Sequence, residues 1–202
     1  MFDVLIKGGP ILWIILALAV PVIAILVERL LYFKKIAADE DKLFARVKGA
    51  IEKGHHDEAL AICDTVEAPL AGLIRAGIEY RALPDAELKE AVRDAAVREL
   101  PQIEHSIGVV NVIGNISPLL GLLGTVSGII SSFNVLGSFG AVSDPSVLAK
   151  GISEALLTTA AGIVIAVPSM IVYAWLSGRA NAVIGRLEGQ ANDLVRLITR
   201  KA

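Results

Sequence analysis

The sequence predicts an all-α integral membrane protein with three transmembrane helices and long cytoplasmic helical extensions. Of its 202 residues, 54% are apolar and 20% are charged, which excludes a disordered or nucleic-acid-binding chain. Asp, Glu, Lys and Arg are absent from residues 8–27, 106–143 and 155–178. Each run reaches the ~20 residues that a helix needs to cross a hydrocarbon layer of ~30 Å.

The first uncharged run is interpreted as a membrane span, not as a cleaved signal peptide. Its A-x-A pattern at residues 17–19 is followed by further apolar residues to Val27, and the basic residues Arg29, Lys34 and Lys35 come only afterwards. Twelve Lys and Arg lie in residues 28–105 and five after residue 178, whereas Lys150 alone lies between the second and third runs. The positive-inside rule therefore predicts an N-terminus that faces outward and a cytoplasmic C-terminus.

These charges divide the chain into four predicted segments. Residues 1–32 hold the first transmembrane helix, and residues 33–105 form a cytoplasmic helical segment. Residues 106–178 hold the second and third transmembrane helices, joined by a short periplasmic loop near residues 140–151. Residues 179–202 form a cytoplasmic C-terminal helix.

Helical patterns fill the predicted cytoplasmic segments. A helix is expected from Asp39 to a C-cap at Gly54, then over 57–63 and 69–83, and then without interruption over 85–139. At ~1.5 Å per residue the last helix would be about 80 Å long and would extend beyond the bilayer as a stalk. The tail carries a heptad seam that is expected to pack on this stalk or on copies of itself. The seam comprises Ala180, Ile184, Leu187, Ala191, Leu194 and Ile198.

Small and hydroxyl residues line one face of each of the last two spans. In the second span they are Gly114, Ser117, Gly121, Thr125, Gly128 and Ser132, and residues 124–128 form a GxxxG pattern. In the third span they are Thr159, Gly162, Ala166, Ser169, Tyr173 and Ser177. Such stripes indicate close helix packing or, in an oligomer, a narrow polar pore. Because a monomer would leave the stripes and the tail seam without partners, a homo-oligomeric ring is expected.

The three runs carry no ionisable side chain, so a proton carrier would have to come from another protein. No Walker loop, GxSxG or HExxH motif is present, and the sequence gives no support for an enzyme. No metal or cofactor is expected, because the His55, His56, Asp57 and Cys63 spacing matches no zinc pattern. The single cysteine is expected to be a reduced thiol.

Two motifs indicate a family. Residues 116–129 resemble the APLLGLLGTVxGM signature of the TolQ/ExbB/MotA proton-channel family, and residues 151–168 are similar to its GIxEALxxTAxGLxxAIP signature. Ser117 replaces the usual Ala, and Ser127 stands where Trp is common. The motifs cover the last two spans, whereas the rest of the chain matches only in layout.

The resemblance implies a typically pentameric ring in the bacterial inner membrane, where the outward-facing N-terminus would be periplasmic. Its pore would hold transmembrane helices of an ExbD- or TolR-like single-span partner bearing an Asp, with a TonB- or TolA-like protein as a further partner. Thr125 and Thr159 match the pore-lining threonines of the family, and Glu154 matches its glutamate at the start of span three. The motif residues expected to serve helix packing are Gly121, Gly124, Gly128, Gly162 and Pro168.

The implied function is conversion of the proton motive force into mechanical work for outer-membrane transport or envelope maintenance. The alternative is a non-conducting scaffold that clusters partners through its small-residue faces. A self-contained transporter is disfavoured, because there is no inverted repeat and no charge inside the spans. A flagellar stator is disfavoured because MotA-type proteins usually have four spans, while a gliding-type motor stays open.

Overall fold

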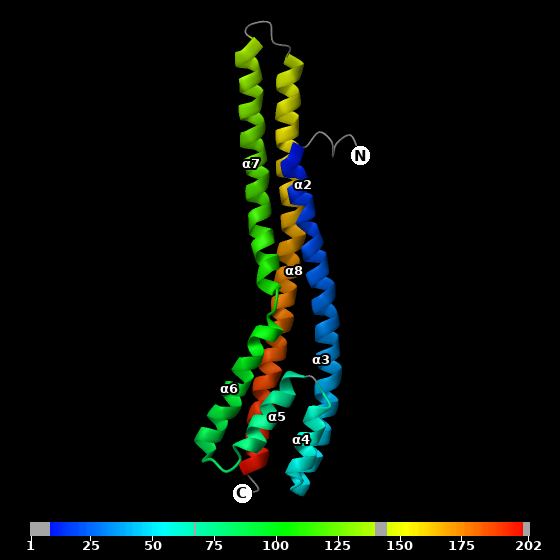
Figure 1. The fold of residues 1–202 in the computed structure, drawn as a ribbon, viewed down its shortest axis with the longest axis vertical. Coiled ribbons are helices and arrows are strands. Elements are labelled where there is room, and N and C mark those ends of the chain that lie inside the picture. Colours follow the sequence, from blue (N-terminus) through cyan, green and yellow to red (C-terminus); the bar gives the residue numbers. More distant parts are fainter. Residues whose placement is uncertain (1–8, 67, 140–144, 200–202) are drawn as a thin grey trace. The chain divides into compact units, whose positions relative to one another are not determined.

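The computed structural model describes residues 9–66, 68–139 and 145–199, and these residues form helices and short connections (Figure 1). Within this part of the chain no strand is found. The helices are α2 (Gly9–Ala17), α3 (Ala19–Lys53), α4 (His56–Asp64), α5 (Pro69–Glu79), α6 (Asp85–Ile103), α7 (Ile107–Phe139) and α8 (Pro145–Thr199). The all-α prediction is therefore confirmed.

Three helical stretches of the described chain are long and apolar enough to cross a membrane. They cover Gly9–Lys53, Ile107–Asn134 and Leu148–Thr199. The most apolar window of each stretch is mostly exposed in the single chain. The buried share of the residues in such a window is 39% or less. The remaining apolar side chains are left for lipid or for other subunits to cover.

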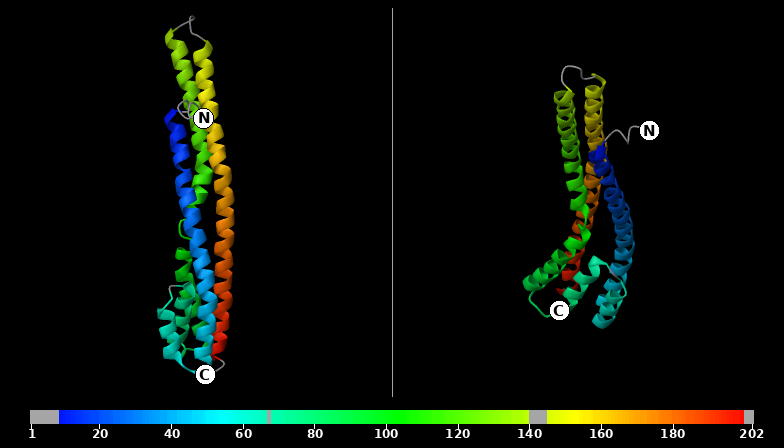
Figure 2. Two further views of the ribbon diagram at one scale, coloured as in Figure 1. Left: turned by 90° about the vertical axis from the view of Figure 1, so that its right-hand side faces the viewer. Right: turned by 45° about the horizontal axis from the view of Figure 1, so that its top comes forward.

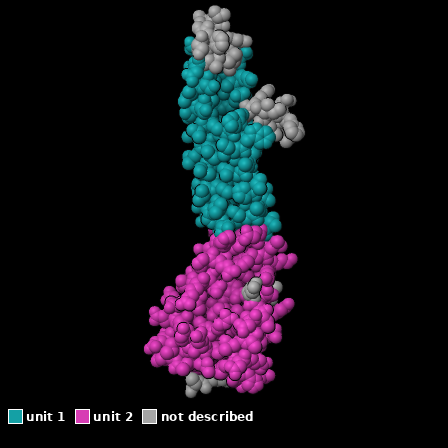
Figure 3. Space-filling model, in the orientation of Figure 1, with its two compact units in different colours: residues 1–27, 106–176 teal, residues 28–105, 177–202 magenta. Residues whose placement is uncertain are grey.

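Contacts divide the chain into two compact units (Figure 3). Unit 1 comprises Met1–Val27 and Ser106–Leu176, and unit 2 comprises Glu28–His105 and Ser177–Ala202. The units divide at residues 27/28, 105/106 and 176/177, whereas the predicted segments divide at 32/33, 105/106 and 178/179. The assignment of the segments to membrane and cytoplasm stays a prediction.

The first span begins with two helices joined at Leu18. Pro21 has no N–H to donate to the carbonyl of Ala17, which explains why α2 ends there. Hydrogen bonds from the Leu18 amide to the carbonyls of Ile14 and Ile15, both 3.2 Å, carry the chain into α3. The separate helix expected from Asp39 onward is thus the C-terminal part of α3. This helix begins in the membrane span and runs without a break to Lys53 (Figure 2).

Gly54 ends α3 as the sequence predicts. Its φ of +81° lies in the left-handed region, which costs a residue with a Cβ ~1–2 kcal/mol. The Gly54 amide donates to the Ile51 carbonyl and the His55 amide to the Ala50 carbonyl, both at 3.0 Å. This pair of bonds is the Schellman arrangement, which satisfies two carbonyls that the helix end leaves free.

The continuous helix predicted over residues 85–139 is wrong. The helix ends at Ile103 and restarts at Ile107, and Ser106 between them has a φ of +61°. Pro101 removes one backbone donor just before this break and clashes with the preceding turn. The uninterrupted 55-residue helix of this protein is α8.

Two further boundaries differ from the predictions. Helix α5 ends at Glu79 instead of residue 83, and residues 80–83 form turns. Pro84 contributes to this early end, because a proline disfavours helical backbone in the residue before it. Helix α8 begins at Pro145, so the expected loop at 140–151 is shorter on its C-terminal side. Residues 140–144 of that loop lie outside the described residues.

Unit 2 has its own apolar core. Its largest fully buried side chains are Leu43, Ile51, Leu70, Leu73, Ile74, Ile78, Leu88, Ile103, Leu187 and Leu194. The tail seam takes part in this core: a Cβ placed on Gly77 of α5 would lie 2.8 Å from Leu194 Cδ2 and 3.2 Å from Ile198 Cδ1. The seam therefore packs on α5 within its own chain. Cys63 is also buried, and this burial raises its thiol pKa to about 11.

The backbone of Gly54 gives a test of the α3 terminus. Gly54→Ala should lower the thermal stability of the detergent-solubilised protein by about 1 kcal/mol, because alanine is strained at φ +81°. Gly49→Ala is the matched control: it also meets no atom within 4 Å, but it lies inside α3 and should be neutral or slightly stabilising. Melting followed by helical circular dichroism measures both, and equal effects would contradict the assigned cap.

Candidate functional site: the α7–α8 hairpin

Helices α7 and α8 approach each other through glycines. A Cβ on Gly121 would lie 2.9 Å from the Thr159 Cα, and one on Gly162 would lie 2.6 Å from the Ser117 carbonyl oxygen. A Cβ on Gly128 would lie 2.9 Å from the Ala155 Cβ. Since these distances leave no room for a side chain, glycine permits the contact between the two backbones.

Most buried hydroxyls of this contact donate within their own helix. Ser117 Oγ donates to the Ile113 carbonyl at 2.7 Å, and Thr158 Oγ1 donates to the Ala155 carbonyl at 2.7 Å. Ser132 and Ser169 make the same kind of bond to the carbonyls four residues before them. Their donors are therefore satisfied without a partner helix, as groups in a low-dielectric region must be.

The two threonines singled out by the sequence behave differently. Thr159 Oγ1 donates across the hairpin to the Gly121 carbonyl at 2.9 Å, so it fastens α8 to α7. Thr125, one helical turn after Gly121, is partly exposed and donates at 2.7 Å to the Leu122 carbonyl of its own helix. Both oxygens still have lone pairs that can accept a hydrogen bond.

Glu154 lies at a cavity of about 220 Å³ within unit 1. The lining residues are Gly9, Pro10 and Ile11 of α2, Gly124, Ser127, Gly128 and Ser131 of α7, and Glu154, Ala155 and Thr158 of α8. Neither Thr125 nor Thr159 belongs to this lining. Glu154 therefore shares its surroundings with Thr158, the residue one helical turn further on.

The sequence-predicted residues are thus placed in three groups. Gly121, Gly128 and Gly162 lie in the hairpin contact, and Gly124 meets the side chain of Thr158. Thr125 and Thr159 lie beside this contact, and Glu154 lies at the cavity. Pro168 is inside α8 and exposed in the single chain.

Sequence reasoning did not single out Thr158, Ser127 and Ser131 as neighbours of Glu154. The i, i+4 spacing of Glu154 and Thr158 and that of Ser127 and Ser131 were the available signals. The sequence does not tell which of the adjacent threonines, 158 or 159, lies at the cavity with Glu154. That depends on how α8 is rotated about its axis, and the packing of the helices determines this rotation.

Arg29 was read from the sequence only as an orienting charge, but it is buried, with 5% of its side chain exposed. Its Nη1 donates to the Gln102 carbonyl at 3.0 Å, its Nη2 donates to Glu28 Oε1 at 2.7 Å, and its guanidinium lies 4.4 Å from the Tyr32 ring centroid. A cation beside the last carbonyls of α6 stabilises the end of that helix, just before the break that separates it from α7.

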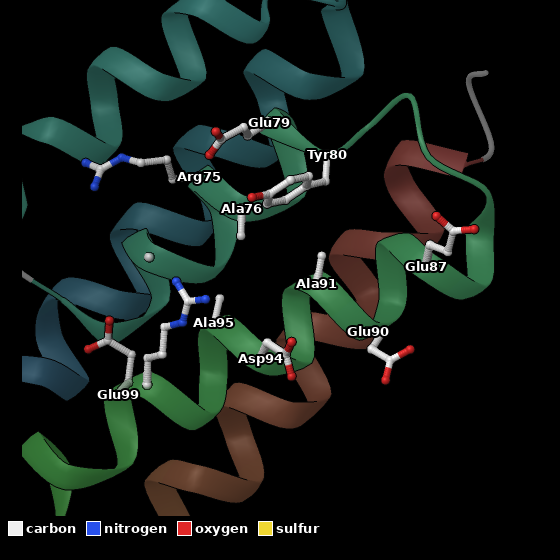
Figure 4. Close-up of a pocket in the computed structure, with 12 residues that line it drawn as sticks. Arg75, Ala76, Glu79, Tyr80, Glu87, Glu90, Ala91, Asp94, Ala95 and Glu99 are labelled. Carbon is white, nitrogen blue, oxygen red and sulfur yellow. The ribbon is translucent and has the colours of Figure 1, made fainter.

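Unit 2 contains a larger groove, of about 520 Å³, between α5 and α6 (Figure 4). Its acidic lining residues are Glu79, Glu87, Glu90, Asp94 and Glu99, and its basic ones are Arg75 and Arg98. Glu99 packs against Gly72, where an added Cβ would lie 2.9 Å from Oε1. Partial burial raises the pKa of the Glu99 carboxyl.

The fold and the hairpin define an all-helical membrane protein whose last two spans touch through their backbones. Residues 65–189 match the model of the MotA/TolQ/ExbB proton channel family. The chain belongs to this family.

Similar proteins agree with this assignment. The biopolymer transport protein ExbB of Neisseria gonorrhoeae is 31% identical over 79% of this chain and 82% of its own length. The Tol-Pal system protein TolQ of Pseudomonas aeruginosa is 37% identical over 58% of this chain. An ExbB homologue of Methanothermobacter thermautotrophicus is 28% identical over 90% of this chain. The chain spans 52% of the length of that TolQ and 64% of that of the archaeal protein.

The partly buried carboxyl of Glu99 predicts a pH dependence. Because its pKa is raised in the folded protein, the charged form disfavours folding, and stability decreases as the pH rises through that pKa. Glu99→Gln should therefore be more stable than the parent protein at neutral pH, and the difference should shrink on acidification. Glu90→Gln, an exposed position of the same groove, is the control. Melting curves across acidic to neutral pH measure both, and a pH-independent difference for Glu99→Gln would contradict this origin.

Proposed function

We propose that this chain is the ring-forming subunit of a proton-driven motor in the inner membrane, with its N-terminus periplasmic and its C-terminus cytoplasmic. It works with an ExbD- or TolR-like single-span protein that carries an intramembrane Asp. It is not an enzyme. The observation that carries this proposal is the pair of threonine hydroxyls beside the α7–α8 contact. The two spans have no Asp, Glu, Lys, Arg or His of their own in residues 106–143 and 155–178.

The hydrogen bonds of the threonines suit them to meet a partner's carboxyl group. Each hydroxyl donates a hydrogen bond to a backbone carbonyl, and its oxygen can still accept one. A protonated Asp has an O–H to donate, whereas an ionised Asp has none. The two threonines therefore favour the neutral form of the partner's carboxyl, which is the form that crosses an apolar region at least cost.

Apolar surface supports the assembly as a ring of subunits. The α7 face that does not contact α8 carries large exposed side chains. They include Leu119, Leu122, Leu123, Val126, Ile129, Ile130 and Phe133. A closed ring, pentameric by resemblance, would place such faces against neighbouring subunits, the partner helices or lipid. Each proton that crosses supplies about 2.3 kcal/mol per 100 mV, so a few protons drive a conformational step.

A non-conducting scaffold is the second candidate. It is favoured by the finding that the buried serine hydroxyls and Thr158 donate within their own helices, as packing residues do. Under this alternative, Thr125 and Thr159 contribute only to packing, and their hydroxyls have no part in proton movement.

Proteoliposomes with a pH-sensitive dye inside test the proposal. Under an imposed gradient, the ring alone should conduct no protons, and co-reconstitution with the Asp-bearing partner should produce proton uptake. Replacement of the partner's Asp by Asn should abolish it. Robust proton uptake by the ring alone, or none with the intact partner, would contradict the proposal.

Threonine variants separate the motor from the scaffold. Thr125→Val should keep assembly and thermal stability but remove partner-dependent proton uptake, because valine matches the threonine in size and lacks the oxygen. Thr159→Val should also lose uptake and, in addition, be less stable by about 0.6 kcal/mol, the mean for an interhelical hydrogen bond in a membrane. Native mass measurement in detergent monitors the ring. Unchanged uptake in both variants would favour the scaffold.

A further inference from the structure

Within unit 2, one face of α8 has no partner in the chain. This outer face lies about 200° around the helix from the buried Leu187 of the tail seam. Its residues are all exposed and are Gly178, Ala182, Gly185, Gly189 and Arg196. A Cβ on any of its three glycines would meet nothing within 4 Å. Because an exposed glycine weakens a helix, these glycines are best explained by a partner whose backbone approaches this face.

Positive charge borders the outer face. Arg179 and Arg186 lie along one side of it and Arg196 lies in it, whereas Asp193 is the acidic residue on that side. Arg186 and Arg196 are exposed, and neither forms an ion pair with any residue that the structure describes. A partner with negative charge would therefore complement this face.

Helix α6 carries such negative charge on one edge. Glu87, Glu90 and Asp94 are exposed along the groove with α5 (Figure 4). Their spacings of three and four residues make them neighbours on the helix surface, where like charges repel. In the described part of the chain none of them forms an ion pair, Arg75 of the groove is paired elsewhere, and Arg98 is unpaired. This acidic edge therefore lacks a basic partner in the single chain.

The acidic edge and the outer face lie at the same height along unit 2. Helices α6 and α8 run antiparallel (Figure 1), and residues 89–96 of α6 line one groove with residues 188–195 of α8. Since both helices rise by ~1.5 Å per residue, Asp94 lies at about the height of Gly189, and Glu87 at about that of Arg196.

The acidic edge is turned away from the α8 of its own chain. It borders the groove with α5, whereas Lys89 and Arg93 are the residues of α6 that face α8. In a closed ring, one surface of each copy meets a different surface of the next copy. When the ring axis runs along these helices, equivalent residues of all copies stay at one height. The acidic edge of one copy then meets the outer face of its neighbour at matching heights.

We propose that the outer face of α8 docks on the acidic edge of α6 of a second copy of this chain. The glycines let the neighbouring helix approach the α8 backbone, and Arg186 and Arg196 pair with its carboxylates. Repeated around the ring, this head-to-tail contact gives every outer face and every acidic edge a partner. The inference rests on the ring assembly of the proposed function but not on proton movement.

Disulfide trapping in membranes tests the contact. A chain with both Asp94→Cys and Gly189→Cys should give a ladder of linked dimers and larger oligomers on oxidation. Either cysteine alone should leave monomers, because a head-to-tail contact does not bring equal residues together. Asp94→Cys with Lys35→Cys is the matched control: Lys35 is exposed on α3, six residues after Arg29, which bonds the Gln102 carbonyl eight residues after Asp94. This control should also leave monomers.

Charge reversal tests the pairing of the arginines. Added to the chain with Asp94→Cys and Gly189→Cys, Arg196→Glu should reduce linkage at least about tenfold, because like charges then face each other. A further Glu87→Arg should restore linkage, since it returns opposite charges to the contact. Linkage that Arg196→Glu leaves unchanged would overturn the proposed pairing.

A larger side chain on the outer face tests the close approach. Gly189→Leu should keep or raise the thermal stability of the single chain, because the position is open and leucine is the better helix former. Native mass measurement in detergent should show the ratio of ring to monomer reduced about tenfold, since the side chain holds the two helices apart. Gly49→Leu, also at an open position, should leave the ring intact. A Gly189→Leu ring as stable as the parent ring would overturn the contact.

The outcomes separate this contact from the motor function. A ladder in a ring that takes up no protons with its Asp-bearing partner supports the contact and overturns the motor. Monomers only, from a protein whose native mass is that of a ring, overturn the contact and leave the motor function in place.

Discussion

The contact between the backbones of α7 and α8 is the constraint on which the rest of unit 1 depends. With Gly121 and Gly162 in this contact, there is no space for a Cβ on either helix, so the two helices have one close-packed register. That register places Thr159 opposite the Gly121 carbonyl and directs Thr158 toward Gly124. A shift of α8 by one residue would place Thr158 where Thr159 lies and Leu157 where Thr158 lies, and the bond across the contact would come from a different residue.

This register also separates two kinds of chemistry. On one side, the hydroxyl groups of Thr125 and Thr159 donate hydrogen bonds to backbone carbonyls, and their oxygens can still accept one. On the other side, Glu154 lies at a partly open cavity that residues of α2 help to line. Gly114, Gly121, Gly128 and Gly162 of the small-residue stripes thus lie in the contact between α7 and α8 of one chain. The oxygens of Thr125 and Thr159, at the edge of this contact, can still accept a hydrogen bond.

The sequence predicts what composition and local backbone chemistry determine. Uncharged runs locate the three spans, and Gly54 marks the end of α3. The sequence does not predict the break at residues 104–106, because Pro101 is tolerated inside α6 and Ser106, which has the positive φ, is a residue type with no special preference for it. The cavity at Glu154 could not be predicted, because it depends on the rotation of α8 and on the first turn of α2, which is distant in sequence.

Disulfide formation tests most directly the claim that the stripes pack within one chain. A Cβ on Gly114 would lie 3.6 Å from the Ser169 Cβ, within the range of a disulfide. The buried Cys63, with its raised pKa, does not compete. Gly114→Cys with Ser169→Cys, oxidised in rings assembled from isotopically labelled and unlabelled chains, should give monomer-sized protein whose linked peptides carry one isotope only. Dimer-sized products with mixed isotopes would show that the stripes join neighbouring subunits and would contradict the account.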